Sequence, residues 1–391
     1  MAKKNKRYNS AGRLFCCIAY FNRGVFLFQA ALSSEFQQKE KAIIPEKLTQ
    51  PIRKIPVKIM MREISELTIA GICRAAAKKY NKRIAFEIYR QGKICCLTSY
   101  RLLGIRHRQF ALLLHRLGIR AGSRVLLMAE NQPEWAEAWF GIALAGAVCI
   151  SAGPDTSDKI IKHIFAHTEL SAICLSRRYE ASCRRAMQCA GIENSVPVII
   201  ITDISNLPQE EPETTNIFPR CLPDDTAVLH YTIDPAGTVQ ETSITNYELI
   251  KQAFTGRIKI FPRDRLLSTI SLANTGELSR GLLRAAAGGA LTVFYDEELS
   301  PHHISDAAMA LRPTIMRVLP GLVTEYRDTI IEPALKADPF YRHPLTKILA
   351  YRKAEKKLLA TLGKYLRCLE IEGTLPDDIK IFFDKIKFPY S

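Results

Sequence analysis

Strands and helices alternate in a regular order between residues 147 and 202, and this alternation limits the fold more than any other feature of the chain. The pattern predicts strand 147–150, helix 157–167, strand 171–176, helix 179–190 and strand 196–202. Successive strands joined by a crossover helix form βαβ units, in which the strands run parallel and the crossover is right-handed. The sequence therefore predicts an α/β fold built on a largely parallel sheet.

A second alternating series follows residues 203–223, a stretch rich in Pro, Glu, Asn and Thr that we expect to be a surface linker. The series predicts strands 226–231, 265–270, 290–295 and 314–318, and helices 245–254, 276–287 and 301–311. Before the first series, the pattern predicts helices 67–80 and 100–117, a hairpin around Gln91-Gly92 and strand 124–129. We therefore expect two lobes that each contain a β-sheet, over about residues 61–202 and 224–391.

The segment 231–249, YTIDPAGTVQETSITNYEL, joins a buried strand to a turn that suits phosphate poorly. Phosphate-binding loops use glycines, hydroxyl donors and a lysine. Here Asp234, Pro235 and Gly237 form the turn, Pro235 has no N–H to donate, and Gln240 is neutral. A carboxylate within about 4 Å of a phosphate costs roughly 1–4 kcal/mol near a protein surface. The charge of Asp234 therefore disfavours an anionic ligand at this loop.

The segment 117–148, LGIRAGSRVLLMAENQPEWAEAWFGIALAGAV, is the first of several blocks with a family pattern. It resembles the N-x-P-E-W block of the adenylate-forming superfamily, the acyl-CoA synthetases and their relatives. The matching residues are Asn131, Pro133, Glu134, Trp135, Gly141 and Gly146. Segments 163–176, 264–294 and 311–330 resemble blocks of the long-chain fatty acyl-CoA branch. The resemblance runs from about Leu67 to the last residue.

Against the superfamily signature Y-T-S-G-T-T-G-x-P-K-G and a later T-H, the segment 231–249 keeps only part of the pattern. The resemblance implies a degenerate remnant of a nucleotide-binding site at the matching residues Tyr231, Thr232, Gly237 and Thr245. The departures include Asp234 for Gly, Gln240 for Lys and Asn246 for His. Asn274 stands where the branch has a histidine, and Gly373 keeps one glycine of a double glycine, which implies substrate-binding positions there. No catalytic residue is expected to be intact.

The resemblance implies a fold like the acyl-CoA synthetase N-terminal domain, two sheet-containing lobes with flanking helices, and truncation before the C-terminal domain. It also implies ATP-dependent activation of a fatty acid through acyl-AMP, with ATP, Mg²⁺ and CoA as cofactors. Because the loop is altered and Ser391 precedes the family's Y-G-x-T-E motif, we expect this activity to be impaired or lost. We also expect the terminal Phe388-Pro389-Tyr390 to leave a sheet edge unpaired.

Three functional alternatives stay open. The first is a long-chain fatty acid–CoA ligase with impaired activity, and the second is a non-catalytic pseudoenzyme that binds an acyl chain or a protein partner. The third is one half of a split ligase whose C-terminal half is a separate chain.

The net charge of +16 is concentrated in the first 60 residues, which hold twelve Lys/Arg against three Glu. We interpret residues 1–60 as a basic extension before a domain at 61–391. Residues 12–33 leave a membrane-targeting role open, but Asn22 and Arg23 interrupt their apolar run, so a start at Met60 or Met61 is favoured. No nucleic-acid motif accompanies the basic residues, so we expect no nucleic-acid partner.

The basic helix expected at 351–363 leaves a peripheral membrane contact open for a protein that we otherwise expect to be cytoplasmic. The eleven cysteines lack a Cys-x-x-Cys pair and lie mostly in apolar runs, which predicts free buried thiols in a reducing compartment. His163 and His167 share a helix face without further ligands nearby, so no metal site is expected.

Overall fold

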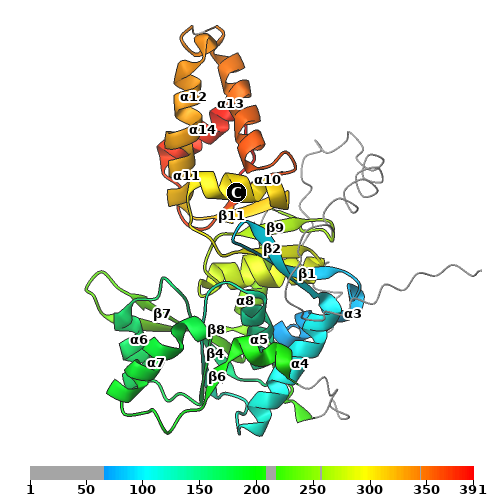
Figure 1. Ribbon diagram of the computed structural model, residues 1–391, viewed down its shortest axis with the longest axis vertical. Helices are drawn as coiled ribbons and strands as arrows, with labels where there is room; N and C mark the ends of the chain where they lie inside the picture. Colours follow the sequence, from blue (N-terminus) through cyan, green and yellow to red (C-terminus); the bar gives the residue numbers. More distant parts are fainter. Residues whose placement is uncertain (1–65, 208–216, 256–257, 344) are drawn as a thin grey trace, which may run out of the picture. The chain divides into compact units, whose positions relative to one another are not determined.

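The computed structural model describes residues 66–207, 217–255, 258–343 and 345–391, and two six-stranded sheets organise these residues (Figure 1). The first sheet has the spatial order β12 (Cys368–Ile371), β11 (Ile315–Val318), β9 (Arg265–Ser268), β10 (Leu291–Tyr295), β1 (Ile84–Arg90) and β2 (Lys93–Ser99). The second has the order β6 (Val198–Ile200), β5 (Ala172–Leu175), β3 (Arg124–Met128), β4 (Val148–Ala152), β7 (Thr226–Ile233) and β8 (Val239–Thr245). Neighbours pair in parallel except in the hairpins β1–β2 and β7–β8. The extension expected at residues 1–60 lies outside the described residues.

Helices connect these strands and cover the sheets. They are α3 (Ile69–Lys79), α4 (Tyr100–Arg116), α5 (Pro133–Leu144), α6 (Asp158–His167), α7 (Arg177–Cys189), η2 (Ile201–Asn206), α8 (Asn246–Phe254), η4 (Glu277–Leu283), α9 (Arg284–Gly288), α10 (Pro301–Leu311), α11 (Pro320–Tyr326), η5 (Arg327–Ile331), α12 (Glu332–Ala337), η6 (Pro339–Tyr341), α13 (Lys347–Leu362) and α14 (Asp377–Ile386). The predicted α/β class is confirmed, and so is the βαβ order predicted for residues 147–202.

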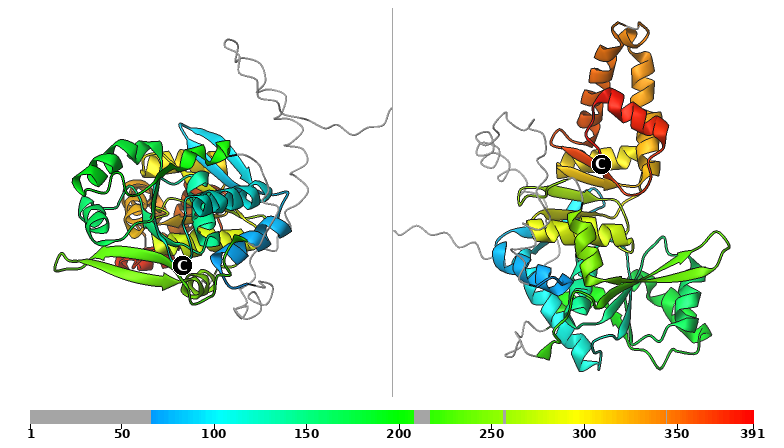
Figure 2. Two further views of the ribbon diagram at one scale, coloured as in Figure 1. Left: turned by 90° about the horizontal axis from the view of Figure 1, so that it is seen from below. Right: turned by 180° about the vertical axis from the view of Figure 1, so that it is seen from behind.

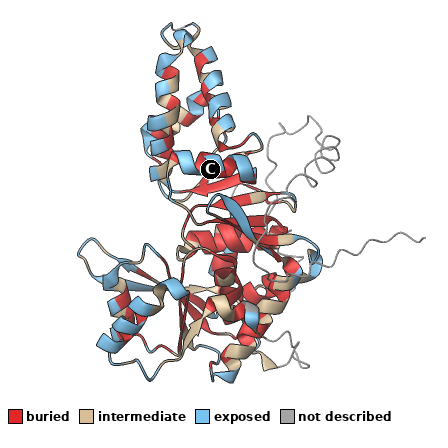
Figure 3. Cartoon of the chain, viewed as in Figure 1, coloured by how far each residue is buried: buried red, intermediate tan, exposed pale blue. Residues whose placement is uncertain are grey.

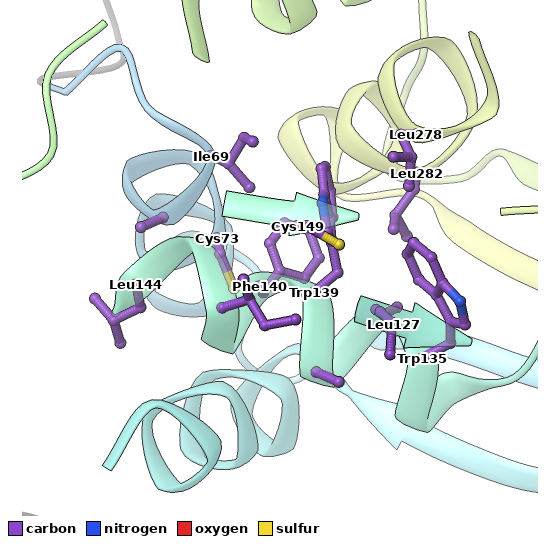
Figure 4. Packing of buried hydrophobic residues seen from close by; sticks show 14 of the residues in the cluster. Ile69, Cys73, Leu127, Trp135, Trp139, Phe140, Leu144, Cys149, Leu278 and Leu282 are labelled. Atoms are coloured by element: carbon purple, nitrogen blue, oxygen red, sulfur yellow. The ribbon is translucent and has the colours of Figure 1, made fainter. Parts of the chain in front are cut away.

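Alternate residues of β3 show that both faces of the second sheet are buried. Val125 and Leu127 pack into a core with Trp135 of α5 (Figure 4), whereas Leu126 and Met128 pack into a separate cluster with residues of α6 and α7. Side chains alternate between the two faces of a strand. A nearly continuous apolar strand is therefore what a parallel sheet covered on both faces requires.

A core between the two sheets, here called the inter-sheet core, holds the largest buried side chains. It combines Phe86 of β1 and Phe294 of β10 with Trp135 and Trp139, and the helices α3, α4, α5, α8 and η4 contribute to it. Figure 3 shows this concentration of buried residues where η4, α5 and the strands meet. The outer face of the first sheet packs against α10, α11, α13 and α14. The described chain thus forms alternating helix and sheet layers.

The two sheets do not coincide with the lobes expected at residues 61–202 and 224–391. β1 and β2 belong to the sheet of β9–β12, and β7 and β8 complete the sheet of β3–β6. The described parts of the expected linker, 203–207 and 217–223, therefore connect strands of one sheet. Apolar periodicity identifies strands locally but does not say which strands pair. The sequence pattern therefore could not predict which strands belong to which sheet.

Two edge elements also differ from the sequence expectations. The pattern does not predict β8, because Gln240, Glu241, Thr242 and Ser243 are polar and exposed. The expectation of an unpaired edge beside β12 is wrong, since the terminal residues lie along that strand. The Leu369 N–H donates to Pro389 O at 3.1 Å, the Ser391 N–H donates to Leu369 O at 3.0 Å, and the Ile371 N–H donates to Ser391 O at 2.9 Å.

Candidate functional site

The predicted turn after β7 is confirmed. The side chain of Asp234 in this turn accepts hydrogen bonds from neighbouring polar groups of the same hairpin. The Thr238 N–H donates to Asp234 Oδ1 at 2.8 Å, and Gln240 Nε2 donates to Asp234 Oδ2 at 3.1 Å. The Gly237 N–H donates to Asp234 O at 2.8 Å, and Gly237 has a φ of 82°, which a glycine adopts without strain. Figure 2 shows the two strands of this hairpin side by side. The carboxylate thus accepts its hydrogen bonds from donors within its own hairpin.

Electrostatics keep this carboxylate charged. The Thr238 N–H and the Gln240 amide hold the pKa of Asp234 below its usual value. The ammonium group of Lys159 on α6 donates a hydrogen bond to the Gly237 carbonyl oxygen. The cation beside the turn is therefore directed at a backbone oxygen, while the turn itself keeps a negative charge.

Tyr231 and Thr232, both predicted from the family pattern, point into different environments. Tyr231 is buried, and its hydroxyl bonds to Thr168 Oγ1 at 2.9 Å and to the carboxylate of Glu241. Burial and then the bond to Glu241 raise the pKa of Tyr231 to about 12. Thr232 is exposed on β7. Tyr231 therefore fixes β7 against α6 and β8.

Thr245 and Asn246 have structural roles at the start of α8. The Thr245 hydroxyl accepts a bond from the Glu248 N–H at 3.2 Å, and Glu248 accepts one from the Thr245 N–H at 2.9 Å. This reciprocal pair is a capping box. Asn246, which replaces the family's histidine, is buried and accepts a bond from the Ile69 N–H at 3.1 Å. It also donates to Leu222 O at 3.2 Å, so it ties α3 to the segment before β7.

Asn274 caps the helical segment that begins at Glu277. Its Oδ1 accepts bonds from the Gly276 N–H at 2.8 Å and from the Glu277 N–H at 3.3 Å. Side-chain oxygens satisfy N–H groups at a helix start in this way. The side-chain oxygen of Asn274 is therefore engaged with its own backbone.

Gly373 and its neighbour Glu372 follow β12 and reach the segment capped by Asn274. A Cβ on Gly276 would collide with the carboxylate of Glu372, so a larger residue there would displace this side chain. Glu372 also forms an ion pair with Arg280 of η4. Gly373 has a φ of 116°, a conformation that favours glycine. The structure thus brings together Gly276 and Glu372, the neighbours of the predicted substrate-binding positions Asn274 and Gly373, and places a carboxylate at their contact.

Beneath this contact lies a buried cluster of charges centred on Arg317 of β11, which we call the Arg317 cluster. Arg317 contacts Glu277 at 2.6 Å, Glu370 at 2.6 Å and Glu372 at 2.7 Å, and Arg284 pairs with Glu370. Burial alone would lower the pKa of Arg317, but Glu277 and Glu370 raise it above its usual range. Burial likewise opposes the charged form of Glu370, yet Arg284 and Arg317 hold its pKa below the usual value. The sequence gives no signal of this cluster, because its members lie on separate elements.

Asn131 connects the two sheets. Its Nδ2 donates to Ile270 O at 2.7 Å and its Oδ1 accepts from the Leu272 N–H at 2.8 Å. Ser151, at the carboxyl end of β4, donates to Ala273 O at 3.0 Å. Asn131 therefore anchors the segment after β9 to the second sheet. The N-x-P-E-W pattern marked this residue, but its role required the tertiary structure.

The described residues can be compared with the requirements of a metal site and of a membrane-spanning helix. No group of three or more His, Cys, Asp or Glu side chains is placed to hold a metal ion within residues 66–207, 217–255, 258–343 and 345–391. The centres of the His163 and His167 rings lie 4.6 Å apart on α6. Among the helices that the structure describes, none is long and apolar enough to cross a membrane.

Comparison with known sequences identifies the family. Residues 73–369 match the family described as AMP-binding enzyme. The chain belongs to the AMP-binding enzyme family. The resemblance of the blocks around Asn131 and Tyr231 to adenylate-forming enzymes is therefore confirmed at the level of the family.

Curated relatives of this AMP-binding protein include CoA ligases. It is 24% identical over 267 residues to a crotonobetaine/carnitine–CoA ligase of Salmonella typhi, a match that covers 65% of this chain and 50% of the relative. It is 23% identical over 328 residues to the corresponding ligase of Shigella flexneri, which covers 77% of this chain and 62% of the relative. The chain thus spans about half the length of the Salmonella relative.

Solved structures of adenylate-forming enzymes share the fold. The inhibitor-bound N-terminal domain of FACL13 from Mycobacterium tuberculosis superposes with a TM-score of 0.64 at 15% identity, covering 83% of this chain and 74% of that chain. The anthranilate CoA ligase AuaEII in complex with anthranoyl-AMP gives a TM-score of 0.64 at 14% identity, covering 83% of this chain and 58% of that chain. The expectation of a fold like the N-terminal domain of these enzymes is confirmed.

Proposed function

We propose that this AMP-binding protein is a non-catalytic relative of the acyl-CoA ligases, which keeps their α/β framework but does not activate a carboxylate with ATP. The observation that carries the proposal is the Asp234 carboxylate, bound within its own turn by the Thr238 N–H and the Gln240 amide. A phosphate at this turn would have to displace the carboxylate from those donors and then lie beside its charge. Two like charges about 4 Å apart repel by roughly 1–4 kcal/mol near a protein surface.

The residues present therefore do not fit the triphosphate of ATP at this turn. Pro235 lacks an N–H, Gln240 provides no positive charge, and Lys159 donates to the Gly237 carbonyl oxygen. Stabilisation of a pyrophosphate leaving group needs donors and cations that are already aimed at the developing charge. The turn instead aims its donors at a carboxylate.

A second carboxylate supports the proposal at the other predicted position. Glu372 lies against Gly276 and is held by Arg280 and Arg317, next to the segments of Asn274 and Gly373. An uncharged acyl chain or adenine ring placed there would have to move an ion-paired side chain. We therefore infer that this site also departs from the one implied by the family resemblance.

The ligand and the partner of such a protein belong to the same proposal. An acyl group remains the first candidate, because the family resemblance implies a fatty acid and the curated relatives act as crotonobetaine/carnitine–CoA ligases. ATP, Mg²⁺ and CoA are cofactors by family only. A protein partner, including a separate chain that carries a ligase C-terminal domain, is the other candidate.

Two measurements on the full chain test the loss of activation. We expect no ATP–pyrophosphate exchange with fatty acids of C8 to C18, carnitine, crotonobetaine or anthranilate, and no shift of the melting temperature with ATP and Mg²⁺. The paired substitution Asp234→Gly with Gln240→Lys removes the internal anion and adds a cation at the turn. We expect this variant to gain a nucleotide-dependent rise in melting temperature.

A matched control carries Asp224→Gly with Gln188→Lys, which changes the same residue types at exposed positions outside the hairpin. Like the unmodified chain, this control should show no rise in melting temperature with ATP and Mg²⁺. Exchange by the unmodified chain with any of these acids would refute the proposal. Exchange only after addition of a chain that carries the C-terminal domain would instead establish the split ligase.

A further inference from the structure

A helical hairpin formed by α12, η6 and α13 presents its inner side to the core and its tip to solvent. Leu335, Ala350, Ala354 and Leu358 are buried in the cluster that covers the outer face of the first sheet. The last three recur every fourth residue and so form a stripe along one side of α13. Tyr351 and Leu359 of α13 pack partly against the same cluster, and Figure 1 shows α12 and α13 running side by side.

Four large apolar side chains are exposed within ten residues at the tip of the hairpin, and we call them the tip cluster. Their exposed fractions are 40% for Phe340, 85% for Leu345, 54% for Ile348 and 43% for Leu349. Ile348 lies two residues before Ala350, about 160° around the helix from the buried stripe. The tip cluster therefore faces away from the core. Single exposed apolar residues are common, but a cluster of this kind marks an interaction surface.

Polar contacts hold the tip in a defined shape. The Phe340 N–H donates to Asp338 Oδ1 at 2.9 Å, and Lys353 pairs with Asp338 at 2.9 Å. The Thr346 hydroxyl donates to Phe340 O at 3.0 Å, which closes the turn before α13. These bonds are internal to the hairpin and join residues on both sides of Leu345.

Positive charge surrounds the tip cluster. Residues 332–364 hold eight Lys/Arg against three Asp/Glu, a net charge of +5. Arg342 and Arg352 are exposed, and Lys347 lies with its ammonium 4.5 Å from the centre of the Tyr341 ring. A helix rises about 1.5 Å per residue, so Arg352 lies roughly 6 Å behind Ile348 along the axis of α13. Arg342 and Lys347 lie within the span of the tip cluster, and Arg352 follows it.

We propose that the tip of this hairpin docks on the surface of an anionic lipid bilayer. Peripheral membrane elements bury apolar side chains roughly 5–10 Å into the boundary between headgroups and acyl chains, while their Lys/Arg side chains meet the lipid phosphates. The tip cluster and the cations within and behind it match both parts of this arrangement. Charge complementarity selects anionic lipid over neutral lipid. The proposal goes beyond the proposed function and does not depend on nucleotide binding.

Co-sedimentation of the full chain with lipid vesicles tests the proposal. We expect binding to vesicles of phosphatidylcholine and phosphatidylglycerol at a 3:1 ratio, weaker binding to pure phosphatidylcholine, and a loss of binding as salt is raised. Leu345→Asn with Ile348→Asn should weaken binding by roughly tenfold, since two inserting side chains are lost. Arg342→Gln with Arg352→Gln should weaken binding to anionic vesicles by a similar factor.

Controls separate the tip from other basic or apolar regions, including the first 60 residues. Leu97→Asn removes an apolar side chain that is 55% exposed on β2, and Arg184→Gln with Arg185→Gln removes two exposed cations of α7. Both controls should bind as the unmodified chain does. If the tip variants bind as well as the controls, another region makes the contact and the proposal is wrong.

A site-specific probe reports insertion directly. Trp135 and Trp139 are fully buried, so Leu345→Trp adds one exposed indole to a constant background. We expect its fluorescence to shift to the blue and to be quenched by brominated lipid when anionic vesicles are added. An indole at residue 345 that stays unshifted while the protein sediments with vesicles would overturn the proposal. An absence of any vesicle binding would do so as well, and would favour a protein partner for this surface.

Discussion

At the scale of single residues, Glu137 of α5 shows how burial sets a charge. Its carboxyl is fully buried, and burial raises its pKa from 4.5 to about 7, although Arg106 at 2.8 Å opposes the rise. The folded state therefore holds the proton more tightly than the unfolded state, and this contribution to stability is lost as the pH rises from about 4.5 to 7. We predict that Glu137→Gln removes this loss. The free energy of unfolding of the variant, relative to that of the unmodified chain, should therefore rise by roughly 2–3 kcal/mol between pH 4.5 and pH 8.

Urea unfolding at several pH values measures this difference. Glu193→Gln is a matched control, because Glu193 is exposed and lies outside α5. The pH dependence of the control should follow that of the unmodified chain. Equal pH dependence for Glu137→Gln and Glu193→Gln would contradict the assignment of the loss to Glu137.

At the scale of elements, the start of α8 distinguishes two possible roles of the Thr245 hydroxyl, nucleotide binding and helix capping. The family pattern marks Thr245 as a nucleotide-binding position, whereas the structure uses its hydroxyl to cap α8 opposite Glu248. Loss of such a cap costs about 1 kcal/mol, and other capping side chains replace it. We predict that Thr245→Ala lowers the free energy of unfolding by about 1 kcal/mol and that Thr245→Asp largely retains it. Thermal unfolding of both variants measures this.

Thr232→Ala serves as the comparison, because Thr232 is also a family match but is exposed on β7. It should change stability little. A loss with Thr245→Asp as large as that with Thr245→Ala would rule out capping as the role of the hydroxyl.

At the scale of the whole molecule, the Arg317 cluster joins elements that are distant in the sequence. Arg317 is fully buried between carboxylates of η4, of β12 and of the residue after β12. Removing one partner from a buried ion pair leaves an uncompensated charge and costs roughly 3–5 kcal/mol. We predict this loss for Arg317→Met in urea unfolding. Arg177→Met, which breaks an exposed pair with Asp203, should cost less than about 1 kcal/mol.

A finding that the two methionine variants are equally stable would mean that the cluster does not contribute to global stability. A second variant, Arg317→Met with Glu277→Gln, removes one carboxylate charge together with the cation. It should be more stable than Arg317→Met alone, because less unpaired charge stays buried.

The sequence predicted the elements better than the site. The strands and helices of residues 147–202 and the turn at Asp234 follow from local periodicity and turn chemistry, and the structure contains them. The family blocks led to Asn131 and Tyr231, but not to their roles as an anchor between sheets and as a buried contact between β7 and α6. β8 escaped prediction because an exposed edge strand carries no apolar pattern.

The sequence by itself determined the α/β class, the order of strands and helices in residues 147–202 and the family, because apolar spacing and short motifs are local properties. The tertiary structure alone decided which strands share a sheet, where the Asp234 carboxylate binds, and how Arg317 is neutralised. Partners such as Glu277 and Arg317 lie on different elements, and only the packed layers bring them within bonding distance. The exposure of Ile348 was decided in the same way, since the packing of α13 fixes which of its sides face solvent.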